Sequence, residues 1–110
     1  MKPWMSDNEI GLVMKYLSSD KVMLEWGSGG STNTFSKFVK KYYSIEHDTS
    51  WANKVQKNLN SNVTFYHIPQ SKGYDSNIPL RNIYSNLVTS YSKYIKQIHN
   101  LNEKYFDIIL

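Results

Sequence analysis

The feature that most constrains this chain is a short apolar run that ends in glycines, at residues 22–30. A near-continuous apolar run of this length is typical of a buried parallel strand. Glycines at its end let the backbone turn tightly and let a ligand approach closely. From Ser31 to Lys41, apolar residues recur at helical spacing with lysines on the opposite face. The stretch therefore predicts a strand, a glycine-rich turn and a helix.

The rest of the chain alternates between helical and strand patterns. Helices are predicted at residues 7–17, 31–41, 48–59 and 81–102, and strands at 22–26, 42–45, 63–68 and 106–110. Ser6 and Glu9 form a capping box for the first helix, and Asp48 or Thr49 can cap the third. This alternation predicts one α/β domain over residues 1–110, with a Rossmann-like parallel sheet of about four strands and flanking helices. Because the chain ends inside its fourth predicted strand, we expect this sheet to be incomplete, truncated at that strand.

Composition excludes several classes of protein. The chain has 110 residues and no cysteine, so disulfides and thiolate metal sites are excluded. No pair of histidines with a carboxylate has metal-ligand spacing, and no metal site is predicted. Apolar runs are too short to cross a bilayer and no signal peptide is present, so we expect a cytoplasmic location. With a net charge of +4 and lysines at positions 37, 40 and 41, nucleic-acid binding is possible, but a solvated helix face explains these lysines better.

The glycine turn has the elements of a nucleotide-cofactor site. The helix that starts at Ser31 and Thr32 offers free N–H donors. Glu46 ends the next strand nineteen positions after Gly27, close to the spacing expected for a carboxylate that binds ribose hydroxyls. A dinucleotide fingerprint would have a third glycine where this chain has Thr32, and a P-loop would have a lysine, which residues 22–36 lack. Neither of these two sites is therefore favoured.

The stretch Leu24-Glu25-Trp26-Gly27-Ser28-Gly29-Gly30-Ser31-Thr32 resembles the first motif of class I S-adenosylmethionine-dependent methyltransferases. Glu25, Gly27 and Gly29 match its E/D-x-G-x-G pattern, whereas Ser31 stands where the family often has a further glycine. Residues 43–48 resemble the second motif, which implies that Glu46 binds ribose. Residues 106–110 look like the family's fourth strand. The residues of both motifs particularly resemble those of methyltransferase-like proteins that often come from viruses or algae.

This resemblance implies S-adenosylmethionine as the cofactor. A sulfonium and an ammonium group would be attracted by Glu25, which would repel a pyrophosphate. The predicted cofactor-binding residues are Glu25, Trp26, Gly27, Ser28, Gly29, Ser31, Thr32, Glu46, His47 and His67. No catalytic residue is assigned, because methyl transfer depends mainly on alignment of donor and acceptor. The resemblance also implies that most of the acceptor site follows the fourth strand.

Several of these residues have a structural alternative. Trp26 and Trp51 could stack on adenine or pack helix against sheet. Glu25 could bind nearby backbone N–H groups, and Glu46 could cap a helix. His47 could contact ribose or adenine, or lie on the surface, and the histidine at position 67 could contact adenine or be a satisfied, partly buried side chain.

Three functions therefore stay open at this stage. The chain could transfer a methyl group to an unidentified acceptor, or it could cleave the cofactor as a lyase or hydrolase does. It could also be a non-catalytic binding module, which associates with a second copy through an exposed sheet edge.

Overall fold

The computed structural model describes residues 2–69, 94, 96–101, 103 and 105–110. Its helices and strands are α1 (Asp7–Met14), β1 (Val22–Trp26), α2 (Gly30–Ser36), β2 (Lys41–Glu46), α3 (Thr49–Val55), η1 (Gln56–Asn58), β3 (Val63–His67), η2 (Gln97–Asn100) and β4 (Ile108–Ile109). Strands thus alternate with helices, as the sequence predicts.

The four strands form one parallel sheet in the order β3-β2-β1-β4. The chain moves outward from β1 to β3 and then crosses back, so that β4 lies on the other side of β1. This is the strand order of a Rossmann-like fold, in which ligands bind where the order reverses, at the carboxyl ends of the strands. The predicted α/β fold with a parallel, Rossmann-like sheet and flanking helices is confirmed.

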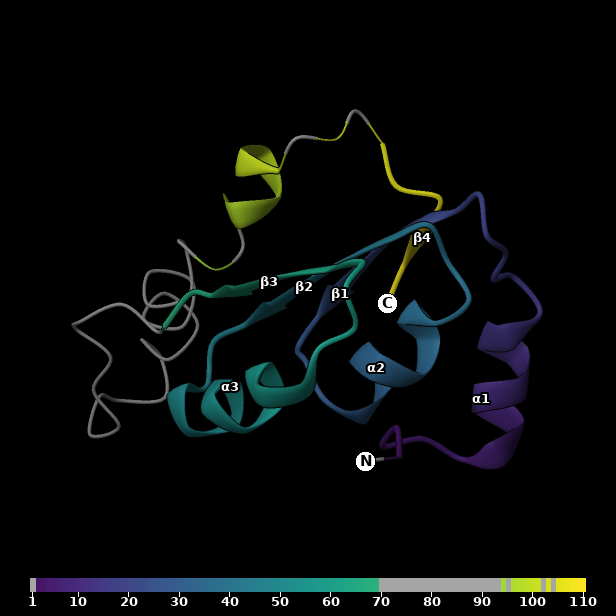
Figure 1. Cartoon of the computed structure of the whole chain (residues 1–110), viewed down its shortest axis with the longest axis horizontal. Coiled ribbons are helices and arrows are strands. Elements are labelled where there is room, and N and C mark those ends of the chain that lie inside the picture. The colour runs from purple at the N-terminus through teal and green to yellow at the C-terminus, as the bar shows by residue number, and fades with distance from the viewer. Residues whose placement is uncertain (1, 70–93, 95, 102, 104) are drawn as a thin grey trace, which may run out of the picture.

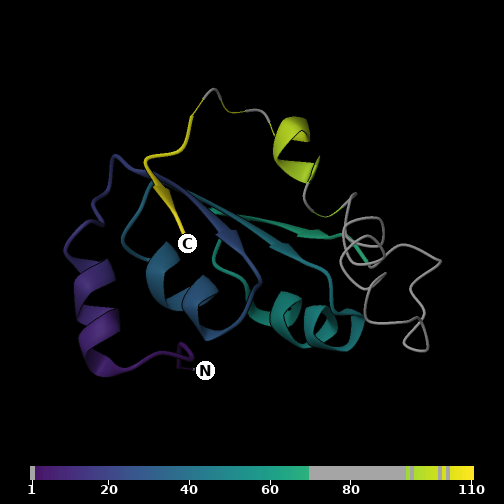
Figure 2. The same ribbon diagram turned by 180° about the vertical axis from the view of Figure 1, so that it is seen from behind.

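Helices α1, α2 and α3 cover one face of the sheet, and η2 lies over the other (Figures 1 and 2). On the first face the core consists of Met23, Phe35, Val39 and Tyr42, against which the apolar side of α1 packs. On the second face it consists of Leu24, Tyr43, Ile45 and Leu101. Alternate residues of β1 and β2 thus enter opposite cores, as expected for a sheet buried on both faces.

Helix α2 is shorter than predicted, because it ends at Ser36 and not at Lys41. The amide of Asn62 donates to the carbonyls of Ser36 and Val39, at 2.7 and 3.0 Å, and so satisfies groups that a longer helix would have bonded internally. The backbone N–H of Lys40 donates to Lys21 O at 2.9 Å, which draws the chain directly into β2. Tertiary contacts therefore override the helical periodicity of this stretch.

The other boundaries differ by a few residues. Helix α1 ends at Met14 instead of residue 17, and α3 ends at Val55, with the single 3-10 turn η1 completing the predicted stretch. Strand β4 is assigned only two residues, but Asp107 N donates to Val22 O and Leu110 N donates to Leu24 O, both at 2.9 Å. Backbone pairing with β1 therefore covers most of the predicted strand at 106–110.

The predicted helix at 81–102 falls mostly outside the described residues. Within its last part, Gln97–Asn100 forms a 3-10 helix and Leu101 is extended. Within the described part of the chain, no helix is long and apolar enough to cross a membrane. Of the strands that the structure describes, β3 and β4 lie at the edges of the sheet, and self-association through an edge stays a prediction.

Candidate functional site

The glycine turn begins where β1 ends. Gly27 has a φ of 84°, a left-handed conformation that a side chain strains. Its N–H still donates to Ile45 O at 2.7 Å, so the turn starts while it is bonded to β2. A glycine is therefore required here by the backbone conformation.

Ser28 is fixed by three separate groups. Its N–H donates to Glu46 Oε1 at 2.8 Å, and its carbonyl accepts from Trp51 Nε1 at 2.5 Å. Its hydroxyl shares a hydrogen bond of 2.5 Å with the hydroxyl of Ser44. The turn is thus held by β2 and by the first turn of α3, which preorganises the backbone for a ligand.

Glu25 is buried under the turn, with 1% of its surface exposed. It accepts hydrogen bonds from four hydroxyl groups, those of Ser31, Thr32, Tyr42 and Ser44. The last three bonds measure 2.5, 2.6 and 2.7 Å. Hydroxyl donors, and not the backbone N–H groups of the structural alternative, therefore compensate the cost of burying this carboxylate.

Two of the hydroxyl donors to Glu25, Tyr42 and Thr32, are themselves fully buried. Burial together with the neighbouring Glu25 raises the pKa of the Tyr42 phenol. The hydroxyl of Thr32 accepts from Gly29 N at 3.0 Å while it donates to Glu25. The residue that replaces the third glycine of a dinucleotide fingerprint thus closes the turn on the buried carboxylate.

Glu46, unlike Glu25, binds backbone N–H groups. Besides the bond from Ser28, its Oε2 accepts from the N–H groups of His47 and Asp48, at 2.9 and 2.8 Å, and lies 3.1 Å from the Nδ1 of His47. Only 3% of its surface is exposed. Glu46 therefore holds the end of β2 and the glycine turn together.

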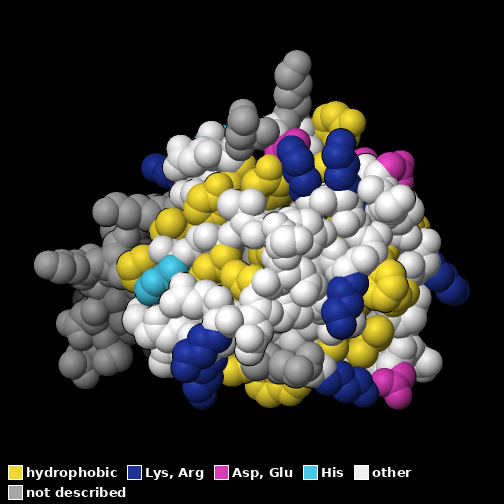
Figure 3. Space-filling model, viewed as in Figure 1, with side chains coloured by type: hydrophobic (Ala, Val, Ile, Leu, Met, Phe, Trp, Pro, Cys, Tyr) yellow, Lys and Arg dark blue, Asp and Glu magenta, His cyan; other side chains and the backbone are white. Residues whose placement is uncertain are grey.

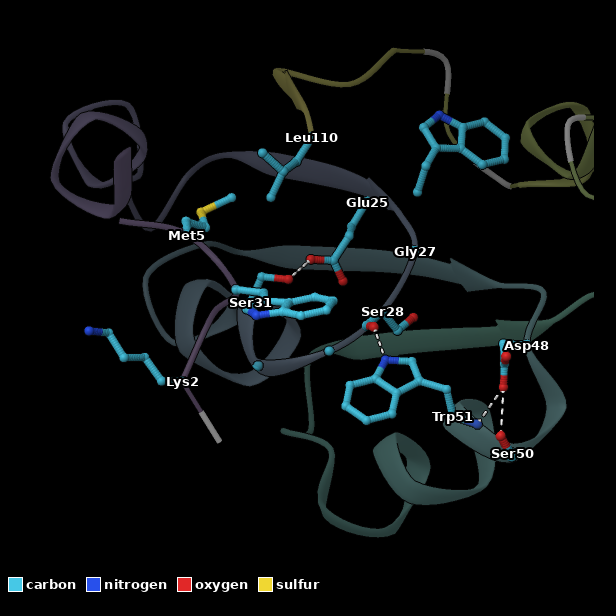
Figure 4. Close-up of a pocket in the computed structure, with 14 residues that line it drawn as sticks. Lys2, Met5, Glu25, Gly27, Ser28, Ser31, Asp48, Ser50, Trp51 and Leu110 are labelled. Carbon is cyan, nitrogen blue, oxygen red and sulfur yellow. Dashed lines mark hydrogen bonds between the residues drawn. The ribbon is translucent and has the colours of Figure 1, made fainter. Parts of the chain in front are cut away.

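A cavity of about 830 Å³ opens at the carboxyl end of β1. It is lined by Lys2, Trp4, Met5, Glu25, Trp26, Gly27, Ser28, Gly29, Gly30, Ser31, Asp48, Ser50, Trp51 and Leu110. Figure 4 shows Lys2 and Met5 on one side of the glycine turn, and Asp48, Ser50 and Trp51 on the other. The volume lies in the upper part of the range typical of small-molecule sites, which is about 300–1,000 Å³.

The walls on the α3 side are ordered by a helix cap. Asp48 is the N-cap of α3, and its carboxylate accepts from Trp51 N and from Ser50 Oγ, both at 2.8 Å. Both hydrogen bonds lower the pKa of Asp48, and the bond from the Trp51 backbone has the larger effect. The ammonium of Lys54 lies 5.8 Å from the centre of the Trp51 ring, within range of a cation–π contact. The indole of Trp51 is thus oriented by its hydrogen bond to Ser28 O and by the ammonium of Lys54 over its ring.

Of the predicted residues, six line the cavity, namely Glu25, Trp26, Gly27, Ser28, Gly29 and Ser31. Thr32 and Glu46 lie behind the turn and support it. His47 stacks on Tyr94, with ring centres 5.2 Å apart, and the same tyrosine meets Trp26 edge to face at 5.1 Å. His67, at the end of β3, has its Nε2 3.2 Å from the Thr49 hydroxyl and does not line the cavity.

Tyr94 lies near enough to both carboxylates of the site for their charge to affect its pKa. Burial raises the pKa of its phenol to about 12, and the negative charges of Glu46 and Glu25 add to this effect, while a backbone hydrogen bond at Gly27 opposes it. The ring therefore packs over the ends of β1 and β2 as a neutral group, between Trp26 and His47.

Sequence reasoning missed the contribution of the N-terminal segment. Lys2, Trp4 and Met5 line the cavity although they precede β1 by seventeen residues or more. No local pattern marks them, and the one available signal is an isolated tryptophan beside Pro3 ahead of a helix cap. The carboxylate of Asp48 was predicted only as a cap.

Metal binding and nucleic-acid binding have separate structural signs. Within the described residues, no group of three or more His, Asp or Glu side chains could hold a metal ion. Figure 3 shows Lys and Arg side chains scattered over one face of the molecule and not gathered into a single patch. Nucleic-acid binding stays a prediction.

Fold and site together define a Rossmann-like α/β protein with a cavity at the carboxyl end of β1. No protein-family model matches the chain, and no curated protein matches it in sequence. Among solved structures, the chain is similar to a dimethyladenosine transferase from Plasmodium falciparum, at 18% identity and a TM-score of 0.45. The match covers 88% of this chain and 38% of that one, so the chain spans about two fifths of that protein's length. A likeness this distant says nothing about substrate or reaction.

Proposed function

We propose that the chain binds S-adenosylmethionine and transfers its methyl group to an acceptor molecule. The observation that carries this proposal is the placement of two buried carboxylates, Glu25 and Glu46, on either side of one glycine turn. A turn of this kind, at the end of β1 and at the point where the strand order reverses, is suited to a nucleoside-containing cofactor. The two carboxylates favour a cofactor that carries positive charge.

The charge of the cavity favours a cationic ligand. Glu25 and Asp48 line it, and Glu46 lies directly behind Ser28. Among the described residues of the lining, Lys2 is the one basic side chain, and its ammonium is already 2.8 Å from Asp7 Oδ1. A pyrophosphate would be repelled here, whereas a sulfonium and an ammonium group would be attracted.

The aromatic lining supports the same ligand. Two tryptophans line the cavity beside the glycine turn: Trp26, which precedes Gly27, and Trp51, which is bonded to Ser28 O. Indole faces attract organic cations, and they stack on planar heterocycles such as adenine. S-adenosylmethionine has both a cationic part and an aromatic part, and it therefore fits the acidic and aromatic residues of the lining.

Glu46 acts on the cofactor through the backbone that it holds. Only 3% of its surface is exposed and it does not line the cavity, but its Oε1 fixes the N–H of Ser28, which does. We assign the ribose to a place beside Ser28, on the α3 side of the turn. Trp51 would then cover the adenosine part, because its indole is fixed to Ser28 O beside the same turn.

When bound, S-adenosylmethionine would supply a methyl group on a sulfonium centre. The lone pair of an acceptor would attack the methyl carbon, and the C–S bond would break with its electron pair left on sulfur as a neutral thioether. Chain residues contribute by position: Glu25 stabilises positive charge at the turn, and the indoles exclude water. The described part of the chain contains no group that we assign as a general base, and the acceptor's proton would be taken by water or by the acceptor's own basic group.

Titration calorimetry with S-adenosylhomocysteine, NAD⁺ and ATP tests this proposal. We expect S-adenosylhomocysteine to bind and the two phosphate-containing ligands to bind at least about tenfold more weakly. Glu46→Gln should weaken the binding, whereas Glu9→Gln, on the exposed face of α1, should not change it. If NAD⁺ or ATP bound more tightly, or if S-adenosylhomocysteine did not bind, the proposal would be wrong. Incubation of S-adenosylmethionine with the protein alone, followed by chromatography, would detect a cofactor-cleaving enzyme.

A further inference from the structure

The N-terminal segment, residues 2–5, forms one wall of the cavity. Lys2, Trp4 and Met5 line it, and Pro3 is buried beneath them. Because these residues come before the first helix, they reach the cavity only by folding back over the start of α2.

The backbone of residues 2 and 3 packs directly on Gly30, which we call the seat of this segment. A Cβ atom placed on Gly30 would lie 2.1 Å from Lys2 O and 2.7 Å from Pro3 N, so only a glycine allows the two backbones to pack. The other end of the segment is fixed by the cap of α1, where Ser6 Oγ accepts from Glu9 N at 3.2 Å. The ion pair of Lys2 with Asp7, at 2.8 Å, closes the loop between the two ends. The backbone of Trp4 is therefore held in place.

The indole of Trp4 differs from the other two. Trp51 is hydrogen-bonded to Ser28, and Trp26 packs edge to face on Tyr94. Trp4 is fully exposed, with a relative accessibility of 105%, and makes no hydrogen bond or ring contact with any other described residue. A fixed backbone thus presents an uncovered aromatic ring at the cavity.

The neighbours of Trp4 in the N-terminal segment lie apart from the side of the cavity that we assign to adenosine. Figure 4 places Lys2 and Met5 across the glycine turn from Asp48 and Trp51. Leu110, which follows β4, adds a second apolar side chain to the lining. With about 830 Å³, the cavity has room for a second small group beside a cofactor.

We propose that Trp4 binds the methyl acceptor, and that the acceptor carries a planar aromatic ring that stacks on its indole. This inference rests on the proposed function, because an acceptor exists only if the chain binds a methyl donor. Stacking requires a flat π face and places the ring at a fixed distance from the indole. Residues 2–5 then select the acceptor, and the glycine turn with α3 holds the donor.

The test measures binding and does not depend on methyl transfer. The protein is saturated with S-adenosylhomocysteine and titrated by NMR with catechol, a small planar probe. Cyclohexane-1,2-diol, which has the same two hydroxyl groups on a saturated ring, is the matched control compound. Protein variants are Trp4→Ala, Trp4→Phe and Tyr16→Ala, the last a control at an exposed aromatic residue of the turn after α1, outside the cavity.

We expect catechol to bind the unchanged protein, and the Trp4→Ala variant to bind it about tenfold more weakly. Trp4→Phe, which keeps an aromatic face, should stay within about threefold, and Tyr16→Ala should bind catechol as the unchanged protein does. The affinity for S-adenosylhomocysteine should hardly change in Trp4→Ala. Because the side chain is exposed, that variant should also unfold at nearly the same temperature.

Three results would overturn the inference while the proposed function stands: catechol fails to bind, cyclohexane-1,2-diol binds equally well, or Trp4→Ala binds catechol as tightly as the unchanged protein. A fourth, an equal loss of S-adenosylhomocysteine affinity in Trp4→Ala, would assign Trp4 to the donor and also overturn it. Failure of the unchanged protein to bind S-adenosylhomocysteine would instead reject the proposed function, and this inference with it.

Discussion

The carboxylate of Glu46 accepts the backbone N–H of Ser28 at 2.8 Å, so the last residue of β2 holds the turn that follows β1. The other oxygen of Glu46 holds the entry to α3 through His47 N and Asp48 N. One side chain thus joins the two loops that border the cavity. A residue that was predicted as a ligand of ribose is also a structural support of the site.

Glu46→Gln should therefore affect both stability and binding. One end of the new amide is a donor, and it must face either Ser28 N or the two N–H groups at α3, so at least one buried bond is lost. We expect the free energy of unfolding to fall by about 1–3 kcal/mol. Denaturant unfolding measures this loss, and calorimetry on the folded variant measures the loss of S-adenosylhomocysteine affinity. An unchanged midpoint would show that these hydrogen bonds do not hold the turn.

Tyr42→Phe removes one of the four hydroxyl donors of Glu25. Because the carboxyl group is buried, the loss of a donor should lower the free energy of unfolding by about 1–3 kcal/mol. Tyr43→Phe is a matched control on the neighbouring residue, whose hydroxyl donates to Glu103 at 2.7 Å in a less buried place. Its cost should be about 1 kcal/mol or less. Equal losses in the two variants would contradict a special role for the cluster around Glu25.

Gly27→Ala tests the backbone conformation of the turn. A Cβ at this position would meet no atom within 4 Å, so the variant introduces strain at a φ of 84° without a steric clash. We expect it to lower the free energy of unfolding by about 1–2 kcal/mol and to weaken S-adenosylhomocysteine binding. Gly11→Ala, in the middle of α1 and equally free of contacts, should instead raise stability by about 0.5–1 kcal/mol. Thermal unfolding of both variants gives the comparison.

Asp48 should make the start of α3 sensitive to acid. Its pKa in the folded chain is lowered from the ordinary 3.8, mainly by the hydrogen bond from Trp51 N. A lowered pKa means that the cap stabilises the fold fully above the unfolded value, and that this stabilisation is lost as the pH falls from 3.8 through the folded value. The amide signal of Trp51 should shift over this range in NMR spectra. Asp48→Asn keeps a capping oxygen that does not titrate, and the same shift in that variant would exclude Asp48 as its cause.

The sequence predicts the sheet better than the helix ends. Strands β1 and β2 lie within a residue of their predicted bounds, because apolar residues fill most of the predicted stretches 22–26 and 42–45. Helix α2 ends early because Asn62, which is 26 positions away, bonds the carbonyl of Ser36. A pattern of local periodicity contains no information about such a partner.

Some residues of the site could also be predicted from local sequence signals, and others could not. The glycine turn, Glu25 and Glu46 carry local signals, and the structure brings them together as expected. The hydroxyl partners of Glu25 could have been found in part, because Ser44 pairs directly with Glu25 in the register of β1 and β2. Trp4 could not have been found, since its place depends on how the N-terminal segment packs over Gly30.

That packing gives a last prediction, in which two adjacent glycines should behave differently. A Cβ on Gly30 would lie 2.1 Å from Lys2 O, whereas a Cβ on Gly29 would meet only the Trp51 ring at 3.6 Å, an ordinary contact. Gly30→Ala should therefore push residues 2–5 away and lower the free energy of unfolding by about 1–3 kcal/mol. Gly29→Ala, whose φ of 173° is extended backbone, should change it by no more than about 0.5 kcal/mol. NMR signals of Lys2 and Trp4 should shift in the first variant and not in the second, and equal shifts would mean that Gly30 is not the seat of this segment.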